Sequence, residues 1–229
     1  MTTAVIVQAR LRSTRLPAKV LLPLPTGRTV LEECLHRCRF IPGVDVVVAA
    51  IADDTGSDLL LPFVEREQAW TPPVIHRNQP GLTPIEIVRG PERDVLARYL
   101  KAAEAVNADI ILRVTSDCPM IDPDLCGKVI AARAEMDADY ACNNMPATFF
   151  HGADCEAFTM DLLRGANEIG DDEYPENRQG VDVWMREAPG ISRYNVTRPG
   201  PSQAHVRFTL DTIDDYEAIC AEFRAREAA

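Results

Sequence analysis

The fold is decided by the stretch Ala4-Val5-Ile6-Val7-Gln8-Ala9 and by the loop that follows it, residues 10–19. A continuous apolar run of this length predicts a strand that is covered on both faces, as in the parallel sheet of an α/β protein. Ligands of such sheets bind at the carboxyl ends of the strands, where this loop would lie. The opening of the chain therefore predicts both a fold class and the place of a site.

Strand and helix patterns alternate along the rest of the chain. Further strands are expected at residues 44–51, 85–88, 109–115 and 139–142, and helices at 29–40, 57–70, 91–107 (with Pro91 in the first turn) and 122–136. Beyond residue 143 the patterns weaken, and they predict helices at 160–169, 182–187 and 214–226, with strands near 191–196 and 206–210. Four prolines make residues 71–84 an expected irregular excursion. The alternation predicts a three-layer α/β/α fold with a mainly parallel, Rossmann-like sheet.

Length and composition fit one domain over residues 1–229, in which residues 143–205 are less regular and are expected to serve the acceptor or a dimer contact. The first residues lack a basic n-region, and the longest apolar runs are far shorter than a membrane span, so a cytoplasmic protein without membrane contact is expected. The seven cysteines form no C-x-x-C pair, which predicts buried, reduced thiols.

The charge of the chain is acidic overall and basic at its front. The formal net charge is −11, which argues against a nucleic-acid polymer as partner. Residues 1–40 nevertheless hold seven Lys and Arg against two Glu. This asymmetry predicts a local site for a compact polyanion.

The loop after the first strand carries the chemistry for that polyanion. Its backbone N–H groups, hydroxyls and fixed cations suit a triphosphate, whose leaving pyrophosphate must be neutralised. It is not a Walker A loop, because no G-x-x-x-x-G-K-[ST] occurs in the chain. The alternative is a solvated basic loop.

Two aspartates at predicted strand ends are candidates for a metal site. Asp117 and Asp211 each follow a short apolar run, and together they would hold Mg²⁺ if their strands are neighbours. Asp122 precedes Pro123 and fits a helix N-cap, whereas Asp214 and Asp215 fit the first turn of a helix.

Four segments carry a recognisable pattern: Q-A-R-x-x-S-T-R-L-P-x-K at residues 8–19, R-G-P-E-R-D-V-L-A-R-Y at 89–99, R-V-T-S-D-C-P-M-I-D at 113–122 and T-L-D-T-x-D-D at 209–215. They resemble the cytidylyltransferase family, and above all its spore coat polysaccharide biosynthesis protein F group. The family also includes CMP-Kdo synthetase and acylneuraminate cytidylyltransferase. The resemblance implies a nucleotide-diphospho-sugar transferase fold and transfer of CMP from CTP to a sugar-type hydroxyl with release of pyrophosphate.

The resemblance also implies roles for individual residues. Catalysis would rest on Arg15, Lys19 and Asp117, and Mg²⁺ would bind Asp117 and Asp211. The nucleotide would contact Gln8, Ala9, Arg10, Ser13, Arg15, Lys19, Arg89, Gly90, Asp94 and Arg98. For Asp94 and Arg98 the spacing alone allows a simple i,i+4 helix pair.

The acceptor side is less regular than the nucleotide side. Glu156, Arg178 and Arg207 are the acceptor candidates, and an acidic sugar could also use Arg193, Arg198 or His205. Residues 176–179 depart from the family's E-H-V-T-like segment and contain no histidine. Relatives are often homodimers. A nucleotide-sugar glycosyltransferase and a non-catalytic nucleotide-binding homologue remain the alternative functions.

Overall fold

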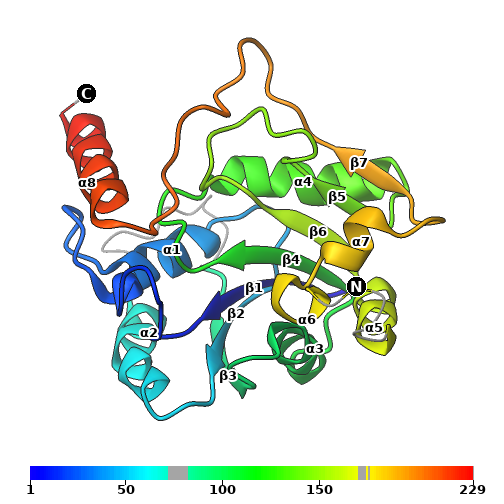
Figure 1. The fold of residues 1–229 in the computed structure, drawn as a ribbon, viewed down its shortest axis with the longest axis horizontal. Helices are drawn as coiled ribbons and strands as arrows, with labels where there is room; N and C mark the ends of the chain where they lie inside the picture. The colour runs from blue at the N-terminus through cyan, green and yellow to red at the C-terminus, as the bar shows by residue number, and fades with distance from the viewer. Residues whose placement is uncertain (72–81, 170–173, 175, 229) are drawn as a thin grey trace.

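The computed structural model describes residues 1–71, 82–169, 174 and 176–228. Most of the excursion expected at 71–84 therefore lies outside the described residues. The strands are β1 (Thr3–Ala9), β2 (Val46–Ala52), β3 (Ile85–Gly90), β4 (Ile110–Thr115), β5 (Tyr140–Cys142), β6 (Glu156–Thr159) and β7 (Arg193–Asn195). They form one seven-stranded sheet in the order β3-β2-β1-β4-β6-β5-β7 (Figure 1).

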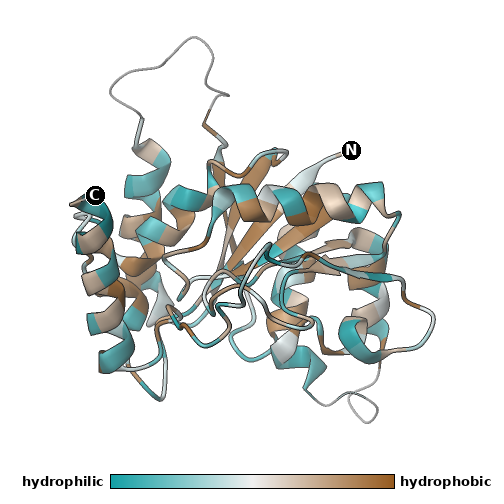
Figure 2. Cartoon of the chain, turned by 90° about the horizontal axis from the view of Figure 1, so that it is seen from above, coloured by the Kyte–Doolittle hydropathy of each residue, from teal (hydrophilic) through white to brown (hydrophobic). Residues whose placement is uncertain are grey.

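The helices surround this sheet. They are η1 (Lys19–Leu21), α1 (Val30–Cys38), η2 (Ser57–Leu60), α2 (Leu61–Ala69), α3 (Val95–Ala105), α4 (Pro123–Glu135), α5 (Met160–Glu168), α6 (Asn177–Gly180), α7 (Val183–Glu187) and α8 (Ile213–Glu227). Seen from above, the apolar strands lie between helices whose outer faces are hydrophilic (Figure 2). The predicted three-layer architecture is confirmed.

The register of the strands sets the edge at which a ligand can bind. β1 pairs in parallel with both β2 and β4, and β2 pairs in parallel with β3. The chain leaves β1 toward β2 on one side, while β4 lies on the other side, so the carboxyl ends of β1 and β4 border a topological switch point. β6 runs antiparallel to β4 and β5, which makes the sheet mainly but not wholly parallel.

The two faces of β1 serve different halves of the core. Val5, Val7 and Ala9 pack in the cluster that contains side chains of α1, α2 and α4. Ala4 and Ile6 pack in the opposite cluster, with side chains of α3, α5 and α7. The period-2 alternation of the strand thus covers both faces of the sheet, as the uninterrupted apolar run predicted.

The last helix stands beside α1 and the loop around η1, away from the sheet (Figure 1). Ile219, Cys220 and Phe223 of α8 pack with Leu24, Val30 and Met120 in a third cluster. A capping box begins the helix: the Thr212 side chain accepts from the backbone of Asp215, and the Asp215 carboxylate accepts from the backbone of Thr212. The expected first-turn position of Asp215 is confirmed.

Two local predictions are wrong, and one strand was not predicted. The helix expected from Pro91 begins at Val95, because the Asp94 side chain accepts from the Ala97 N–H and caps it there. Residues 206–210 form no strand; they make a single bridge, His151 with Arg207, before the Leu210 N–H turns to the Asp117 carbonyl oxygen. Sequence patterns also did not indicate β6, whose first residue is a buried glutamate.

Candidate active site

A compact turn follows β1 and ends in η1. The Ala18 N–H donates to the Leu11 carbonyl at 3.1 Å, and Ala18 adopts left-handed backbone angles with φ 55°. The Leu11 N–H donates to Ser57 Oγ at 3.1 Å, and Asp54 in turn accepts from that hydroxyl at 2.6 Å. This closed turn directs Lys19 inward, where it is buried.

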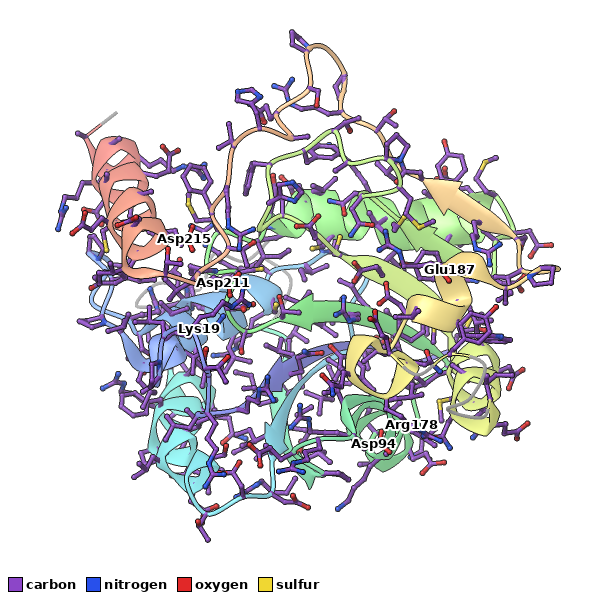
Figure 3. The ribbon with its side chains drawn as sticks, viewed as in Figure 1. Lys19, Asp94, Arg178, Glu187, Asp211 and Asp215 are labelled. Atoms are coloured by element: carbon purple, nitrogen blue, oxygen red, sulfur yellow. The ribbon has the colours of Figure 1, made fainter. Side chains whose placement is uncertain are left out.

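Lys19 connects three segments that are far apart in the sequence. Its ammonium donates to Asp117 Oδ2 at 2.6 Å, to the Leu210 carbonyl oxygen at 2.5 Å and to Asp211 Oδ1 at 2.8 Å. The Leu210 N–H donates to the Asp117 carbonyl at 2.9 Å, which joins the segments after β4 and before α8 directly. The structure therefore brings Lys19, Asp117 and Asp211 together, and the last of these lies near Asp215 at the start of α8 (Figure 3).

Asp211 is surrounded by cations. Besides Lys19, Arg15 Nη2 lies 2.7 Å from its Oδ1, and Arg207 Nη2 donates to its Oδ2. Its own N–H donates to Asp215 Oδ2 at 3.0 Å, which fixes the backbone. By contrast, the Asp117 carboxylate has one ion-pair partner within the described part of the chain, Lys19 on Oδ2, and its Oδ1 has the Cys118 thiol at 3.9 Å. Of the two, Asp117 is the carboxylate with an oxygen left for a ligand.

Two carboxylates around one ammonium are a cation site in chemical terms. Mg²⁺ is bound in proteins by carboxylate oxygens and keeps several waters, so two aspartates fit it. The described residues contain no group of three or more His, Cys, Asp or Glu side chains that could hold a metal. Any divalent ion here would thus rest on Asp117, Asp211 and its own waters or ligands.

A cavity of about 510 Å³ opens beside this cluster, at the carboxyl ends of β1 and β4. Its volume is within the range of small-molecule sites. Six cations line it: Arg10, Arg12, Arg15, Lys19, Arg93 and Arg98. Asp117 is the single carboxylate among the described residues that line it. The wall is strongly electropositive in a protein whose net charge is −11.

The remaining predicted nucleotide residues divide into two groups. Gln8, Ala9 and Ser13 line the cavity, together with Thr14, Thr115 and Gln179, which sequence reasoning did not single out. Arg89, Gly90 and Asp94 do not line it. Arg89 donates to the Ala52 carbonyl, and Asp94 caps α3.

The i,i+4 pair that spacing allowed for Asp94 and Arg98 does not form. Asp94 lies 3.6 Å from Arg178 instead, and the two are neighbours in Figure 3. Gly90, at the end of β3, leaves room for Arg98: a Cβ there would lie 2.9 Å from Arg98 Cγ.

The acceptor candidates do not converge on one place. Glu156 accepts from Arg113 at 2.9 Å and from Asn144 at 2.9 Å inside a buried network, and burial raises the pKa of its carboxyl. Arg178 donates to Asn167, on the side of α3 and α5. Arg207 belongs to the Asp211 cluster.

The structure also tests the predictions for Asp122 and for the cysteines. Asp122 accepts from the N–H groups of Asp124 and Leu125, so its capping role is confirmed. All seven cysteines are buried and free, as expected. Arg193 and Arg198 donate to backbone carbonyls. The described part of the chain holds no helix long and apolar enough to cross a membrane.

The sheet, the switch point and the cationic turn facing an aspartate place the protein in the class of α/β proteins with the layout of a nucleotide site. The profile of the family described as cytidylyltransferase matches residues 4–61. Spore coat polysaccharide biosynthesis protein SpsF of Bacillus subtilis is 32% identical over 228 residues, covering 96% of this chain and 85% of that protein. The chain belongs to the cytidylyltransferase family and is a nucleotidyltransferase enzyme.

Solved structures of similar fold are consistent with this family. A cytidylyltransferase from Leptospira borgpetersenii is 27% identical with a TM-score of 0.81, covering 96% of this chain and 85% of that one. CMP:2-keto-3-deoxy-manno-octonic acid synthetase complexed with CTP is 19% identical with a TM-score of 0.65, covering 99% and 100%. The latter likeness concerns the fold. The family confirms the predicted enzyme class over a glycosyltransferase and over a non-catalytic homologue.

Proposed function

We propose that this enzyme transfers CMP from CTP to a hydroxyl of a small, sugar-type acceptor, with release of pyrophosphate and with Mg²⁺ as the metal. One observation carries the proposal: Lys19 joins Asp117 and Asp211 at the edge of a cavity lined by six cations. CTP is supported by the family and by the CTP-complexed structural neighbour.

In this reaction the acceptor oxygen attacks the α-phosphorus, and the bond from that phosphorus to the bridging oxygen of the β-phosphate breaks. The proton of the hydroxyl is lost to solvent, and the electron pair leaves with pyrophosphate. Such phosphoryl-type chemistry depends mainly on positioning and on neutralising charge. Arg10, Ser13 and Arg15 would hold the phosphates, and Lys19 would meet the charge that develops on the leaving group.

Asp117 and Asp211 would hold Mg²⁺, which supplies charge neutralisation at the phosphates and lowers the pKa of the acceptor hydroxyl. The Lys19 ammonium lies 2.6 Å from Asp117 Oδ2 and 2.8 Å from Asp211 Oδ1, so both carboxylates can contact a single cation. Asp211 also pairs with Lys19 and Arg15, both of which line the cavity. Glu156, Arg178 and Arg207 stay acceptor candidates, and a homodimer through residues 143–205 stays a prediction.

A pyrophosphate-release assay tests the proposal. The four ribonucleoside triphosphates are each combined with ulosonic acids, aminosugars and alditols, in the presence and absence of Mg²⁺. We expect release that needs CTP, an acceptor and Mg²⁺ together. Release of a nucleoside diphosphate from a nucleotide sugar, with none of pyrophosphate from CTP, would overturn the assignment. Omission of the acceptor controls for simple hydrolysis.

A further inference from the structure

Arg98 is a buried arginine that forms no close ion pair within the described part of the chain. It lies on α3, is 1% exposed, and its Nε and Nη1 atoms have no hydrogen-bond partner in the described part of the chain. Burial lowers the pKa of its guanidinium, and the nearby Arg10 acts in the same direction. A buried cation without a partner destabilises the fold, so its presence calls for an explanation such as a bound ligand.

The surroundings of Arg98 direct it toward the cavity. Asp94 caps α3 and sets Arg98 one turn into the helix. Gly90 ends β3 directly against the Arg98 stem, where a Cβ would lie 2.9 Å from Cγ. Arg98 lines the cavity together with Arg93 and Val95. The guanidinium is therefore an unsatisfied donor on the wall of the site.

A second unsatisfied group lies on the same wall. Ala4 and Ile6 of β1 pack in the cluster with α3, and Gln8 is the next residue on that face of the strand. Gln8 Oε1 is buried without a hydrogen-bond partner among the described residues, and Gln8 lines the cavity. The α3 side of the cavity thus offers donors from Arg98 and an acceptor from Gln8.

The chemistry of these two groups distinguishes the parts of a nucleotide. Phosphate oxygens only accept, so they cannot satisfy Gln8 Oε1, and Arg10, Arg12, Arg15 and Lys19 already face the cavity for them. A cytosine ring presents two adjacent acceptors, O2 and N3, beside an amino donor. In uracil the N3 atom carries a hydrogen and would face a guanidinium N–H.

We propose that Arg98 and Gln8 read the pyrimidine edge of the nucleotide: the Arg98 fork donates to O2 and N3 of cytosine, and Gln8 Oε1 accepts from its amino group. The pair thereby selects cytosine over uracil. This assignment rests on the proposed function and adds a specificity determinant to it. A site built to hydrogen-bond one pattern rejects the mismatched base because its own buried groups then stay unpaired.

Arg98→Met tests the proposal, since it keeps most of the side-chain length and removes the charge. Titration calorimetry with CTP, UTP and pyrophosphate should show CTP affinity reduced at least about tenfold, a lost preference for CTP over UTP, and pyrophosphate affinity within about twofold of wild type. The melting temperature of the ligand-free variant should equal or exceed that of wild type, because an unpaired buried charge is gone.

Arg133→Met is the matched control, because the Arg133 side chain on α4 donates to the Ala138 carbonyl and is remote from the cavity. It should leave CTP binding unchanged and should not raise the melting temperature. Gln8→Met should reduce the CTP preference by a smaller factor than Arg98→Met. Arg98→Lys, which retains the charge but loses the fork, serves if Arg98→Met does not fold, and the same loss of base preference is expected.

Each contrary outcome is distinct. Equal losses of CTP, UTP and pyrophosphate affinity would assign Arg98 to the phosphates and overturn the proposal. Unchanged CTP binding with a lower melting temperature would make Arg98 structural. Wild-type protein that binds none of the nucleotides would contradict the proposed function as well. Gln8→Met that weakens CTP but not dCTP would assign Gln8 to the ribose and overturn its part.

Discussion

Two groups of partly buried charge lie on the same sheet and differ in how well they are balanced. The cavity wall at the ends of β1 and β4 brings six cations against one carboxylate. Between β4, β6 and α7, Arg113 and Arg186 instead face Glu156 and Asp182, at 2.9 Å and 3.4 Å respectively. We call the second group the β4–β6 network.

The two groups differ in net charge, which is balanced in the β4–β6 network and positive at the cavity wall. The β4–β6 network has as many acids as bases, so its charges balance without a ligand. The cavity wall carries excess positive charge, which repels itself until an anion arrives. The same residue types therefore balance one another in one place and, under the proposed function, face the phosphates of a nucleotide in the other.

Arg113→Met would test the balance of the β4–β6 network with the largest expected effect. It leaves Glu156 buried without its cation, so the free energy of unfolding should fall by about 3–5 kcal/mol. Urea denaturation measures this. The double variant Arg113→Met, Glu156→Gln should recover most of the loss, and a single-variant loss below about 1 kcal/mol would refute the network's role.

Asp117→Asn tests the cavity side. It removes the carboxylate that lines the cavity while keeping its shape, and kcat should fall at least about a hundredfold, as for other lost preorganised charge contacts. Steady-state pyrophosphate release with saturating CTP measures it. Activity within threefold of wild type would exclude the catalytic role. Asp124→Asn, an exposed change at the start of α4, is the control.

Glu156 also gives the β4–β6 network a pH dependence. Burial raises its pKa above the ordinary value of 4.5, so the folded protein holds this proton to higher pH than the unfolded chain does. Its contribution to stability is complete below pH 4.5 and is lost as pH rises through the folded pKa. Unfolding free energies of wild type and Glu156→Gln, measured from pH 4 to 8, should therefore diverge with rising pH in favour of the variant. Parallel curves would contradict this.

Thr212→Ala has the smallest expected effect. It removes one arm of the capping box that begins α8, next to Asp211, and should cost about 1 kcal/mol of stability. Thr29→Ala, in the buried capping box of α1, should cost more. Thermal unfolding compares the two, and equal losses would show that burial does not matter here.

The sequence predicted the elements around the cavity better than those around the β4–β6 network. The apolar run of β1, the basic loop and the Asp122-Pro123 cap are local signals, and each was found where expected. β6 was not predicted because its first residue is a glutamate, whose burial depends on Arg113 from another strand. A local sequence pattern cannot indicate this ion pair, because Arg113 and Glu156 are 43 residues apart.

The position of Asp211 shows the same limit. Its neighbourhood to Asp117 was expected through a strand over residues 206–210, but that strand does not exist. The contact forms through the Leu210 N–H and the Lys19 ammonium, across 192 residues for the Lys19–Asp211 bond. Likewise, the lack of a hydrogen-bond partner at Arg98 Nε and Nη1 among the described residues is a property of the folded molecule, and the sequence spacing does not indicate it.

The three bonds of the Lys19 ammonium also bear on the order in which the protein is made. The basic turn is synthesised well before two of the oxygens that hold Lys19, because the Leu210 carbonyl oxygen and Asp211 Oδ1 follow 191 and 192 residues later. A chain that ends before residue 210 keeps this turn but lacks two of the three oxygens that hold its lysine. Under the proposed function, such a truncated chain should therefore fail to release pyrophosphate from CTP.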